Sequence, residues 1–534
     1  MTTTIVFNNK FIDNINLIDL KLNRYTYGRN YLYKTFDQHE DKNHIEYIKN
    51  RFDLNDIEYR SLVSIIKSNK NSLETINDKK LKRIESLTEF LNTLKNKETL
   101  TKKDKYNIKK TIEKINYLNK SITNNVVFGS RKALQDLTKA HNNNNKKSSD
   151  EILKKKSIYQ NKRIQDIYII GESNQTGNRF IDFDLNNLTI KYKPNKGNKS
   201  TIKLSRRKSK NKSVNQIDLN LLQELIDSKS ISITVRINHN ETHLSFDLDN
   251  YTGYSMIKKE FIDKAKQEIK DFNIKDKQII KSIYRKNYKL IEEKVIKQNK
   301  LIKNRYCSVD LNPDGIGYSI FDVINNELSF IDNGYIDYSK NNIKLGLSSD
   351  DPKQLKQNRK RKEEILFSLT KLFKSIRHYK CYNFVMEELI FTDIDNKKVY
   401  NRKINNLWCR SLVTQKINKE IKLSMMNLIE VNPCYSSFIG NIKHDCYDPI
   451  AASMEIGRRG HFKYLNGGFF PSISQDDIDT VEKLTNTKVN EDALELSWKS
   501  LFKHCVQFGW RRTMNNYKSF RVGNKKSNTF VYFL

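Results

Sequence analysis

Hydrophobic and polar positions change their period several times along the chain, and each change predicts a different kind of element. Residues 2–12 alternate weakly, as a strand does. From Lys42 to Ser121, Leu and Ile recur at helical spacing among Lys, Glu and Asn, which predicts a helical subdomain with a basic outer face. Residues 165–250 form short β-rich runs between Asn, Gly, Ser and Asp, a pattern typical of a β-barrel or a β-sandwich.

Three further segments connect these regions to one another and to the second half of the chain. VVFGSRKAL, at residues 126–134, predicts a strand followed by a Gly turn with two positive charges. Residues 141–151 are low-complexity polar sequence and predict a loop. Helical spacing returns between residues 254 and 304 and predicts one long basic linker helix.

After Arg305 the pattern predicts three successive strands, in YCSVDL, IGYSIFDVI and ELSFIDNGYID. Asp351 and Pro352 then offer an N-cap and a proline at the first helical position. The helix that they predict carries apolar residues on one face, namely Ile365, Leu369, Leu372 and Ile376. Another apolar strand follows at 382–391, and a third unit runs from a strand at 427–433 to a helix at 448–460.

Charge narrows the range of partners. The 534 residues suffice for about three domains at roughly 150 residues each. Lys and Arg number 97 against 62 Asp and Glu, a formal net charge of +35 that indicates a polyanionic partner, most simply a nucleic acid. Ten basic residues and no acidic one lie between Lys191 and Lys212. This run could be an ordinary solvated hairpin, but the charge of the whole chain favours a phosphate-contacting loop.

The cysteines and the hydropathy exclude other classes of protein. The six cysteines stand at 307, 381, 409, 434, 446 and 505, and no two of them form a C-x-x-C pair. We therefore expect reduced, mostly buried thiols and no structural zinc. No apolar run approaches the roughly 20 residues needed to span a bilayer, so we expect a soluble cytoplasmic protein without a membrane partner.

Three carboxylates stand where successive strand or helix units of the second half end or begin. They are Asp310, Glu387 and Asp448. Each alone could be structural, as a hairpin cap, an exposed strand end or a helix cap. Together they could converge at one sheet edge and hold two Mg²⁺ ions roughly 3.5–4 Å apart for phosphodiester hydrolysis, with Mn²⁺ as a possible substitute.

The same segments resemble the three RuvC motifs of TnpB, the RNA-guided nuclease of insertion sequences, and of the related type V CRISPR effectors. The matching segments are VDLNPDGIGYSI, VMEEL and DPIAASMEIGRRG. The resemblance gives the catalytic and metal-binding roles to Asp310, Glu387 and Asp448, with Glu388 at a second acidic position and Asp445 as the rival third acid. It implies an RNA-guided DNA endonuclease with guide RNA and double-stranded target DNA as partners. The C-x-x-C pairs usual in that family are absent here.

The resemblance also suggests how the chain is divided. We expect a multidomain α+β protein, with a helical recognition subdomain and a β-barrel-like wedge domain followed by an RNase-H-like (RuvC) α/β nuclease domain. The predicted regions are 1–41 (first wedge strand), 42–125 (helical recognition domain), 126–253 (β-rich wedge domain), 254–304 (basic linker helix), 305–460 (RuvC domain) and 461–534 (C-terminal basic-aromatic segment).

Basic residues outside the acidic motifs are the candidate nucleic-acid contacts. Those predicted to bind the guide RNA are Arg131, Lys132, Arg206, Arg207 and Lys208. Arg402 and Arg410 are predicted to contact phosphates near the cleavage centre, and Arg458 and Arg459 are also predicted to bind nucleic acid. For the neighbouring Trp408, core packing is the favoured interpretation.

Three other functions fit parts of the pattern. A guide-RNA-dependent DNA-binding regulator without cleavage would most simply lack one of the acids, and all three are present. A structure-selective DNA resolvase would use the same RNase-H-like core, but some 300 residues precede the core in this chain. A basic packaging protein would not need ordered acidic motifs. The oligomeric state stays open.

Overall fold

The computed structural model describes most of the chain. The residues outside the description are 124–125, 127, 130, 143–148, 162–165, 196–197, 207–216, 313–314, 338–351, 389–409, 463–469, 490–495 and 509–534. The rest forms two compact units: an amino-terminal unit of Thr2–Lys208 and Ile217–Asp247, and a carboxy-terminal unit formed mainly by Leu248–Leu534. In the described parts, no helix combines the length and the apolarity needed to cross a membrane.

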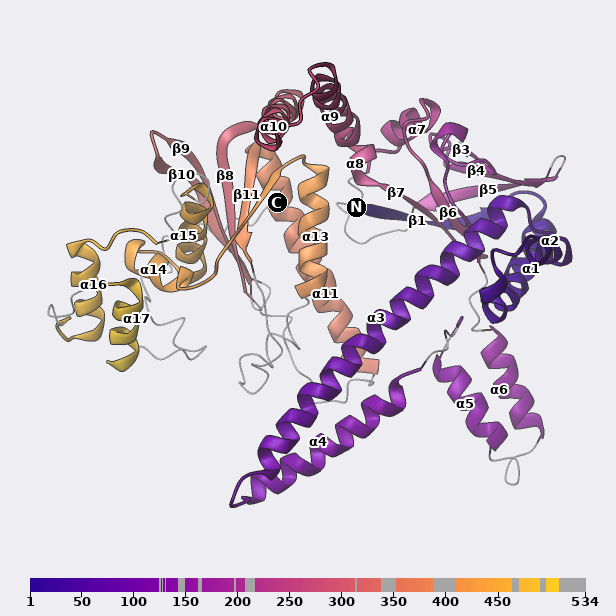
Figure 1. The fold of residues 1–534 in the computed structure, drawn as a ribbon, viewed down its shortest axis with the longest axis horizontal. Helices are drawn as coiled ribbons and strands as arrows, with labels where there is room; N and C mark the ends of the chain where they lie inside the picture. Colours follow the sequence, from indigo (N-terminus) through magenta and orange to yellow (C-terminus); the bar gives the residue numbers. More distant parts are fainter. Residues whose placement is uncertain are drawn as a thin grey trace. The chain divides into compact units, whose positions relative to one another are not determined.

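A seven-stranded antiparallel sheet organises the amino-terminal unit (Figure 1). Its strands are, in spatial order, β2 (Ile167–Ile169), β6 (Thr234–Ile237), β7 (Glu241–Asp247), β1 (Thr2–Phe11), β5 (Asn198–Arg206), β4 (Thr189–Asn195) and β3 (Ile181–Asp184). The predicted first strand, β1, is central, because Thr2 pairs with Asp247 of β7 and Phe7 pairs with Arg206 of β5. The β-rich interpretation of residues 165–250 is confirmed, apart from the helix α7 (Leu219–Asp227) within it.

Helices make up the rest of this unit. They are α1 (Ile15–Lys34), α2 (Lys42–Phe52), α3 (Asp56–Lys95), α4 (Lys102–Ser121), α5 (Arg131–Asn142) and α6 (Ser149–Asn161). The helical prediction for 42–121 is confirmed: α3 starts at a capping box made by Asn55 and Glu58, and α4 folds back along it (Figure 1). The sequence did not predict α1, whose Asn, Tyr, Thr and Gly residues have low helix propensity. Helix α5 starts at Arg131, within the segment predicted as strand and turn.

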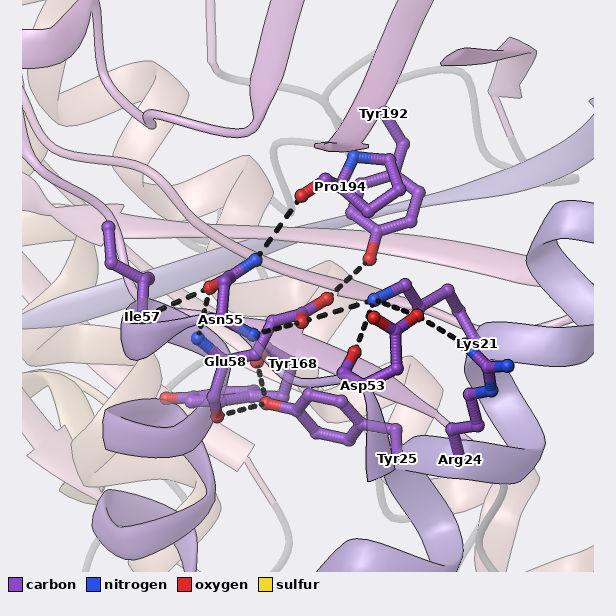
Figure 2. Close-up of polar contacts among 10 residues, drawn as sticks. All are labelled: Lys21, Arg24, Tyr25, Asp53, Asn55, Ile57, Glu58, Tyr168, Tyr192 and Pro194. Atoms are coloured by element: carbon purple, nitrogen blue, oxygen red, sulfur yellow. Dashed lines mark hydrogen bonds and ion pairs between the residues drawn. The ribbon is translucent and has the colours of Figure 1, made fainter. Parts of the chain in front are cut away.

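A buried polar network fixes the start of α3 against α1 and β4 (Figure 2). Glu58 is fully buried and accepts hydrogen bonds from the Tyr192 hydroxyl at 2.7 Å and from Lys21 Nζ at 3.4 Å. Lys21 also donates to the Asp53 carbonyl at 2.7 Å, just before the helix begins. Because a buried charge is costly without partners, these bonds stabilise the docking of the start of α3 on α1 and β4.

A five-stranded mixed sheet organises the carboxy-terminal unit. In spatial order its strands are β10 (Glu327–Asp337), β9 (Gly315–Ile324), β8 (Ile302–Leu311), β11 (Cys381–Glu387) and β12 (Asn427–Val431). The first three form the predicted antiparallel meander, and β8, β11 and β12 are mutually parallel. The sheet is thus mixed, with an antiparallel meander on one side and three parallel strands on the other. Every residue of β11 is buried, as expected for a central strand covered on both faces.

Helices cover both faces of this sheet (Figure 1). One face packs on α11 (Pro352–His378) and α13 (Arg410–Leu423), and the predicted apolar stripe of α11 is fully buried there. The other face carries α15 (Asp448–Phe462), preceded by α14 (Ser436–Lys443). Two further helices, α16 (Gln475–Thr485) and α17 (Trp498–Gln507), lie in the segment predicted as a basic-aromatic tail.

The predicted single linker helix is wrong in one respect. Residues 254–304 contain two helices, α9 (Tyr254–Asp271) and α10 (Lys277–Asn299), and the start of β8. The break follows from Asn273, which adopts a left-handed conformation (φ 46°), and from Asp276, which caps α10 through the amide groups of Gln278 and Ile279. Both residues favour a turn, but the sequence prediction gave more weight to the apolar spacing on either side of them.

Candidate active site

Strand alternation places Asp310 and Glu387 on the same face of the sheet. In β8, Cys307, Val309 and Leu311 belong to the core under α11, so Ser308 and Asp310, which alternate with them, face α15. In β11, Met386 packs under α11, whereas Val385 packs with Ile456 of α15. Glu387 therefore shares the α15 face with Asp310. Since β8 and β11 are parallel, both acids lie at the carboxyl ends of their strands.

Asp448 reaches this edge from the first residue of α15. The predicted helix start at Asp448 and Pro449 is confirmed, and Ala451 and Ala452 are fully buried. The approach is close: a Cβ atom added to Gly317 of β9 would lie 2.0 Å from the Pro449 carbonyl oxygen. Glycine is therefore required at 317, and this contact fixes the helix start beside the end of β8.

The three carboxylates interact through their charges. Burial raises the pKa of Asp310 well above its usual value, and the charges of Glu387 and Asp448 raise it further. Burial also raises the pKa of Glu387, and a hydrogen bond from Ser436 and the positive charge of Arg459 offset part of this rise. Burial raises the pKa of Asp448 to about 7. Buried like charges that disfavour one another's ionised forms are typical of functional acidic sites.

Each carboxylate accepts a hydrogen bond from a neutral side chain that sequence reasoning missed. Asn312 Nδ2 donates to Asp310 at 2.5 Å, and Ser436 Oγ donates to Glu387 at 2.5 Å. Asn441 Nδ2 donates to Asp448. Asn312 could have been found from its place in the turn two residues after Asp310. Nothing in the spacing of Ser436 or Asn441 pointed to these roles.

The donor set suits a hard divalent cation. Three carboxylates supply the oxygen ligands that Mg²⁺ and Mn²⁺ prefer, and a cation would relieve the repulsion that raises the pKa of Asp310. Within the described ranges, however, no group of three or more Asp, Glu, His or Cys side chains is already arranged to hold a metal ion. The acids thus fit a metal by chemistry and by charge, without standing in a completed coordination geometry.

The two rival acids lie elsewhere. Asp445 is exposed in the loop before α15, and Glu388 is exposed just beyond the end of β11. The charges acting on Asp310 are those of Glu387 and Asp448. Sequence reasoning preferred Asp448 over Asp445 for the small residues that follow it, and its position beside Asp310 favours the same choice.

Arg459, predicted to contact nucleic acid, is instead buried and hydrogen-bonded to other residues of the protein. Its side chain is buried, with Nε 2.7 Å from Glu455 and Nη1 donating to the carbonyl oxygens of Asn432 and Cys434 at 2.8 Å each. Arg458 also pairs with Glu455 but is partly exposed. Because a phosphate contact requires a group at the surface, a structural role fits Arg459 better.

The other predicted basic contacts are only partly within the described structure. Lys132 on α5 and Arg206 at the end of β5 are exposed, as a phosphate contact requires. Arg131 and Arg410 begin α5 and α13, respectively. Arg207, Lys208, Arg402 and Trp408 lie outside the described residues. Arg131 and Lys132, Arg206 and Arg410 thus belong to three different elements, α5, β5 and α13.

Comparison with known proteins finds similarity only among solved structures. No model of a known protein family matches the chain, and no curated protein matches it. A Cas12f1–sgRNA–target DNA complex matches with 12% identity over 86% of this chain and 98% of the other, at a TM-score of 0.33. A CRISPR–Cas12f ternary complex matches with 12% identity over 85% and 98%, at a TM-score of 0.21.

Thermus thermophilus RuvC, in complex with a Holliday junction substrate, matches a smaller part. The identity is 7% over 30% of this chain and 96% of the other, and the TM-score is 0.22. Scores this low do not establish a function. What the acidic edge can do chemically follows from its own residues: three buried carboxylates that share one sheet edge can bind divalent cations and so support metal-dependent hydrolysis.

Proposed function

We propose that the protein is an RNA-guided DNA endonuclease of the RuvC type, with Asp310, Glu387 and Asp448 as its metal ligands. The observation that supports this most directly is the influence of Glu387 and Asp448 on the pKa of Asp310, because it brings together acids from three separate elements. The mixed sheet of the carboxy-terminal unit supplies the scaffold on which these acids meet.

The chemistry divides between the cation and the chain. When bound, Mg²⁺ or Mn²⁺ would activate the attacking water and stabilise the leaving oxygen of the phosphodiester. The chain holds the three carboxylates out of bulk water, where charges act more strongly. Ser436 and Asn441 orient the carboxylates of Glu387 and Asp448 by hydrogen bonds. Because the pKa of Asp448 is raised to about 7, protons compete with the cation at neutral pH.

RNA guidance is the part of the proposal that rests on charge. The formal net charge of +35 includes basic residues clustered outside the nuclease core, for which a nuclease that met only substrate DNA would have little need. Lys132 and Arg206 are exposed in the amino-terminal unit, whereas the acids belong to the carboxy-terminal unit. A structured guide RNA bound by that unit would account for this charge, and base pairing would then supply the sequence specificity.

The test is cleavage by the full chain with its co-purified RNA and a matched DNA target. We expect Asp310→Ala, Glu387→Ala and Asp448→Ala each to lower Mg²⁺- or Mn²⁺-dependent cleavage by roughly a thousandfold or more, with DNA binding kept. Asp445→Ala is the matched control and should cleave normally. Normal cleavage by Asp448→Ala together with loss in Asp445→Ala would show that the third ligand is wrongly assigned.

Sequencing of the co-purified RNA separates the alternatives. A defined RNA species that directs cleavage to a complementary target supports the proposal. If the purified protein carries no specific RNA and cuts branched DNA unaided, the resolvase interpretation replaces it. If the protein binds guided targets and never cleaves them with either metal, it is a regulator.

A further inference from the structure

Helix α14 (Ser436–Lys443) touches two of the three acids. Its first residue, Ser436, is buried, and its hydroxyl donates to Glu387 Oε1 at 2.5 Å. Near its other end, the buried Asn441 donates to the Asp448 carboxylate and to the Ser437 carbonyl, the latter at 2.7 Å. One short helix therefore contacts acids that come from different elements, β11 and α15.

One side of α14 packs so closely against α15 that no side chain fits between the two backbones at Gly440. A Cβ atom added to Gly440 would lie 2.4 Å from the Ala451 carbonyl oxygen and 2.9 Å from the Ala452 amide nitrogen. The backbones of the two helices are therefore in direct contact one turn after Asp448. A shift of α14 would change the position of α15 and the hydrogen bond to Asp448 together.

The side of α14 that faces away from α15 packs into a separate apolar core. Phe438, Ile439 and Ile442 of α14 pack there with residues of α16 and α17. Phe438 meets the rings of Trp498 and Phe502 of α17, with centroids 6.1 and 5.4 Å apart. The partners on α16 and α17 are almost completely buried, and they are Val481, Trp498, Leu501 and Cys505.

Two polar contacts fix the same arrangement. Lys443, the last residue of α14, pairs with Asp477 of α16 at 2.6 Å. Asp477 is itself buried and accepts hydrogen bonds from the amide and hydroxyl of Ser474, which cap α16. Trp498 Nε1 donates to the Pro471 carbonyl at 2.6 Å. The Lys443–Asp477 pair thus ties α16 to α14, and the Trp498 bond ties α17 to the segment before α16, in addition to the apolar packing.

We propose that α14 is a positioning element, through which the C-terminal helices α16 and α17 set the placement of Glu387 and Asp448. This rests on the proposed function, in which these two acids are metal ligands. Ser436 and Asn441 are positioning residues, since each acts on the metal through a carboxylate. The segment after α15 then supports the metal site in addition to any contact that it makes with nucleic acid.

The direct test removes single donors and measures Mn²⁺ binding by calorimetry together with cleavage kinetics, on the full chain with its RNA. Ser436→Ala and Asn441→Leu should each weaken Mn²⁺ binding by roughly tenfold and lower kcat, with the KM for DNA unchanged. Ser436→Thr, which keeps the hydroxyl, should restore most of the affinity. Ser437→Ala, the same change one position along the helix, is the matched control and should bind Mn²⁺ as the wild type does.

The test of the C-terminal helices uses a pair of buried leucines. Leu501 of α17 and Leu222 of α7, in the amino-terminal unit, are both fully buried. Leu501→Ala should weaken Mn²⁺ binding by several-fold, whereas Leu222→Ala, an equal truncation outside this core, should keep the wild-type Mn²⁺ affinity. If a high Mn²⁺ concentration returns the kcat of Leu501→Ala to the wild-type value, the lost activity is due to weaker metal binding.

Asp310→Ala separates failure of this inference from failure of the proposed function. If Asp310→Ala abolishes Mn²⁺ binding while Ser436→Ala, Asn441→Leu and Leu501→Ala all bind normally, the positioning role is wrong and the metal site stands. If Asp310→Ala also binds Mn²⁺ normally and cleaves, the proposed function itself is wrong. If Leu501→Ala and Leu222→Ala weaken binding equally, general destabilisation explains both and the coupling is refuted.

Discussion

Replacing Asp448 by Asn should stabilise the metal-free protein, and the effect should depend on pH. Asn keeps the size of the side chain and an oxygen that can accept from Asn441, but it carries no charge. The pKa of Asp448 is raised from 3.8 to about 7 by burial. A shift of about three units corresponds to about 4 kcal/mol, at about 1.4 kcal/mol per unit.

The sign follows from which state binds the proton. Between pH 4 and pH 7 the folded wild type holds a proton on Asp448 that the unfolded chain releases, so raising the pH favours unfolding. The stability that this proton contributes is complete below about pH 4 and is lost as the pH rises through about 7. Asp448→Asn does not titrate. The difference in stability between the variant and the wild type should therefore be small at pH 4 and reach about 4 kcal/mol near pH 8.

The assay is thermal unfolding of both proteins with chelator present, from pH 4 to pH 8, followed by calorimetry. Groups away from the acidic site titrate alike in both proteins, so the difference between the two curves reports Asp448 together with Asp310, whose pKa the Asp448 charge raises. For a unit of this size, about 4 kcal/mol corresponds to a difference on the order of 10 °C in Tm at pH 8. Mg²⁺ should remove much of the difference by stabilising the wild type alone. A difference that stays constant across this pH range, or a variant that is less stable at pH 8, would refute the reasoning.

Three other predictions concern packing, zinc and RNA. Gly317→Ala should destabilise the carboxy-terminal unit by several kcal/mol, because its Cβ would meet the Pro449 carbonyl; denaturant unfolding measures this, and a loss below about 1 kcal/mol would contradict the close approach. Elemental analysis should find no stoichiometric zinc, and Cys434→Ser and Cys446→Ser should each leave activity unchanged, whereas one zinc per chain would overturn this. Neutralising the predicted guide contacts together should remove the co-purified RNA and leave Mn²⁺ affinity unchanged; retention of the same RNA would show that it binds elsewhere. Those contacts are Arg131, Lys132, Arg206, Arg207 and Lys208.

The acidic site could be predicted because its residues interrupt strong patterns. Asp310 and Glu387 end runs of buried strand residues, and Asp448 begins a helix with small residues at its second turn. The period of each run determines which face a residue occupies, so the two strand acids could be assigned to one sheet edge from spacing alone. The stripe of α11 was predictable for the same reason.

The residues that act on these acids could not be found in that way. Ser436 and Asn441 are ordinary polar residues until α14 is docked, and the docking depends on apolar contacts with α17, some 60 residues further on. The sequence of α17 reads equally well as a basic-aromatic tail, because its alternation of Lys and aromatic residues is compatible with either. Arg459 was predicted as a surface residue for a similar reason: only tertiary structure shows the carbonyl groups and the Glu455 that enclose it.

The central place of β1 in its sheet has a consequence for biosynthesis. Its partners are β5 and β7, so a ribosome must extend the chain to Asp247 before the pairing of β1 with β7 can be completed. At roughly 5–20 residues per second, that delay is on the order of 10–50 s. The hairpin of α3 and α4 can form in the meantime, because its contacts are local. Until then β1 is an unpaired strand with both edges open, and such a strand is prone to aggregate unless a chaperone binds it.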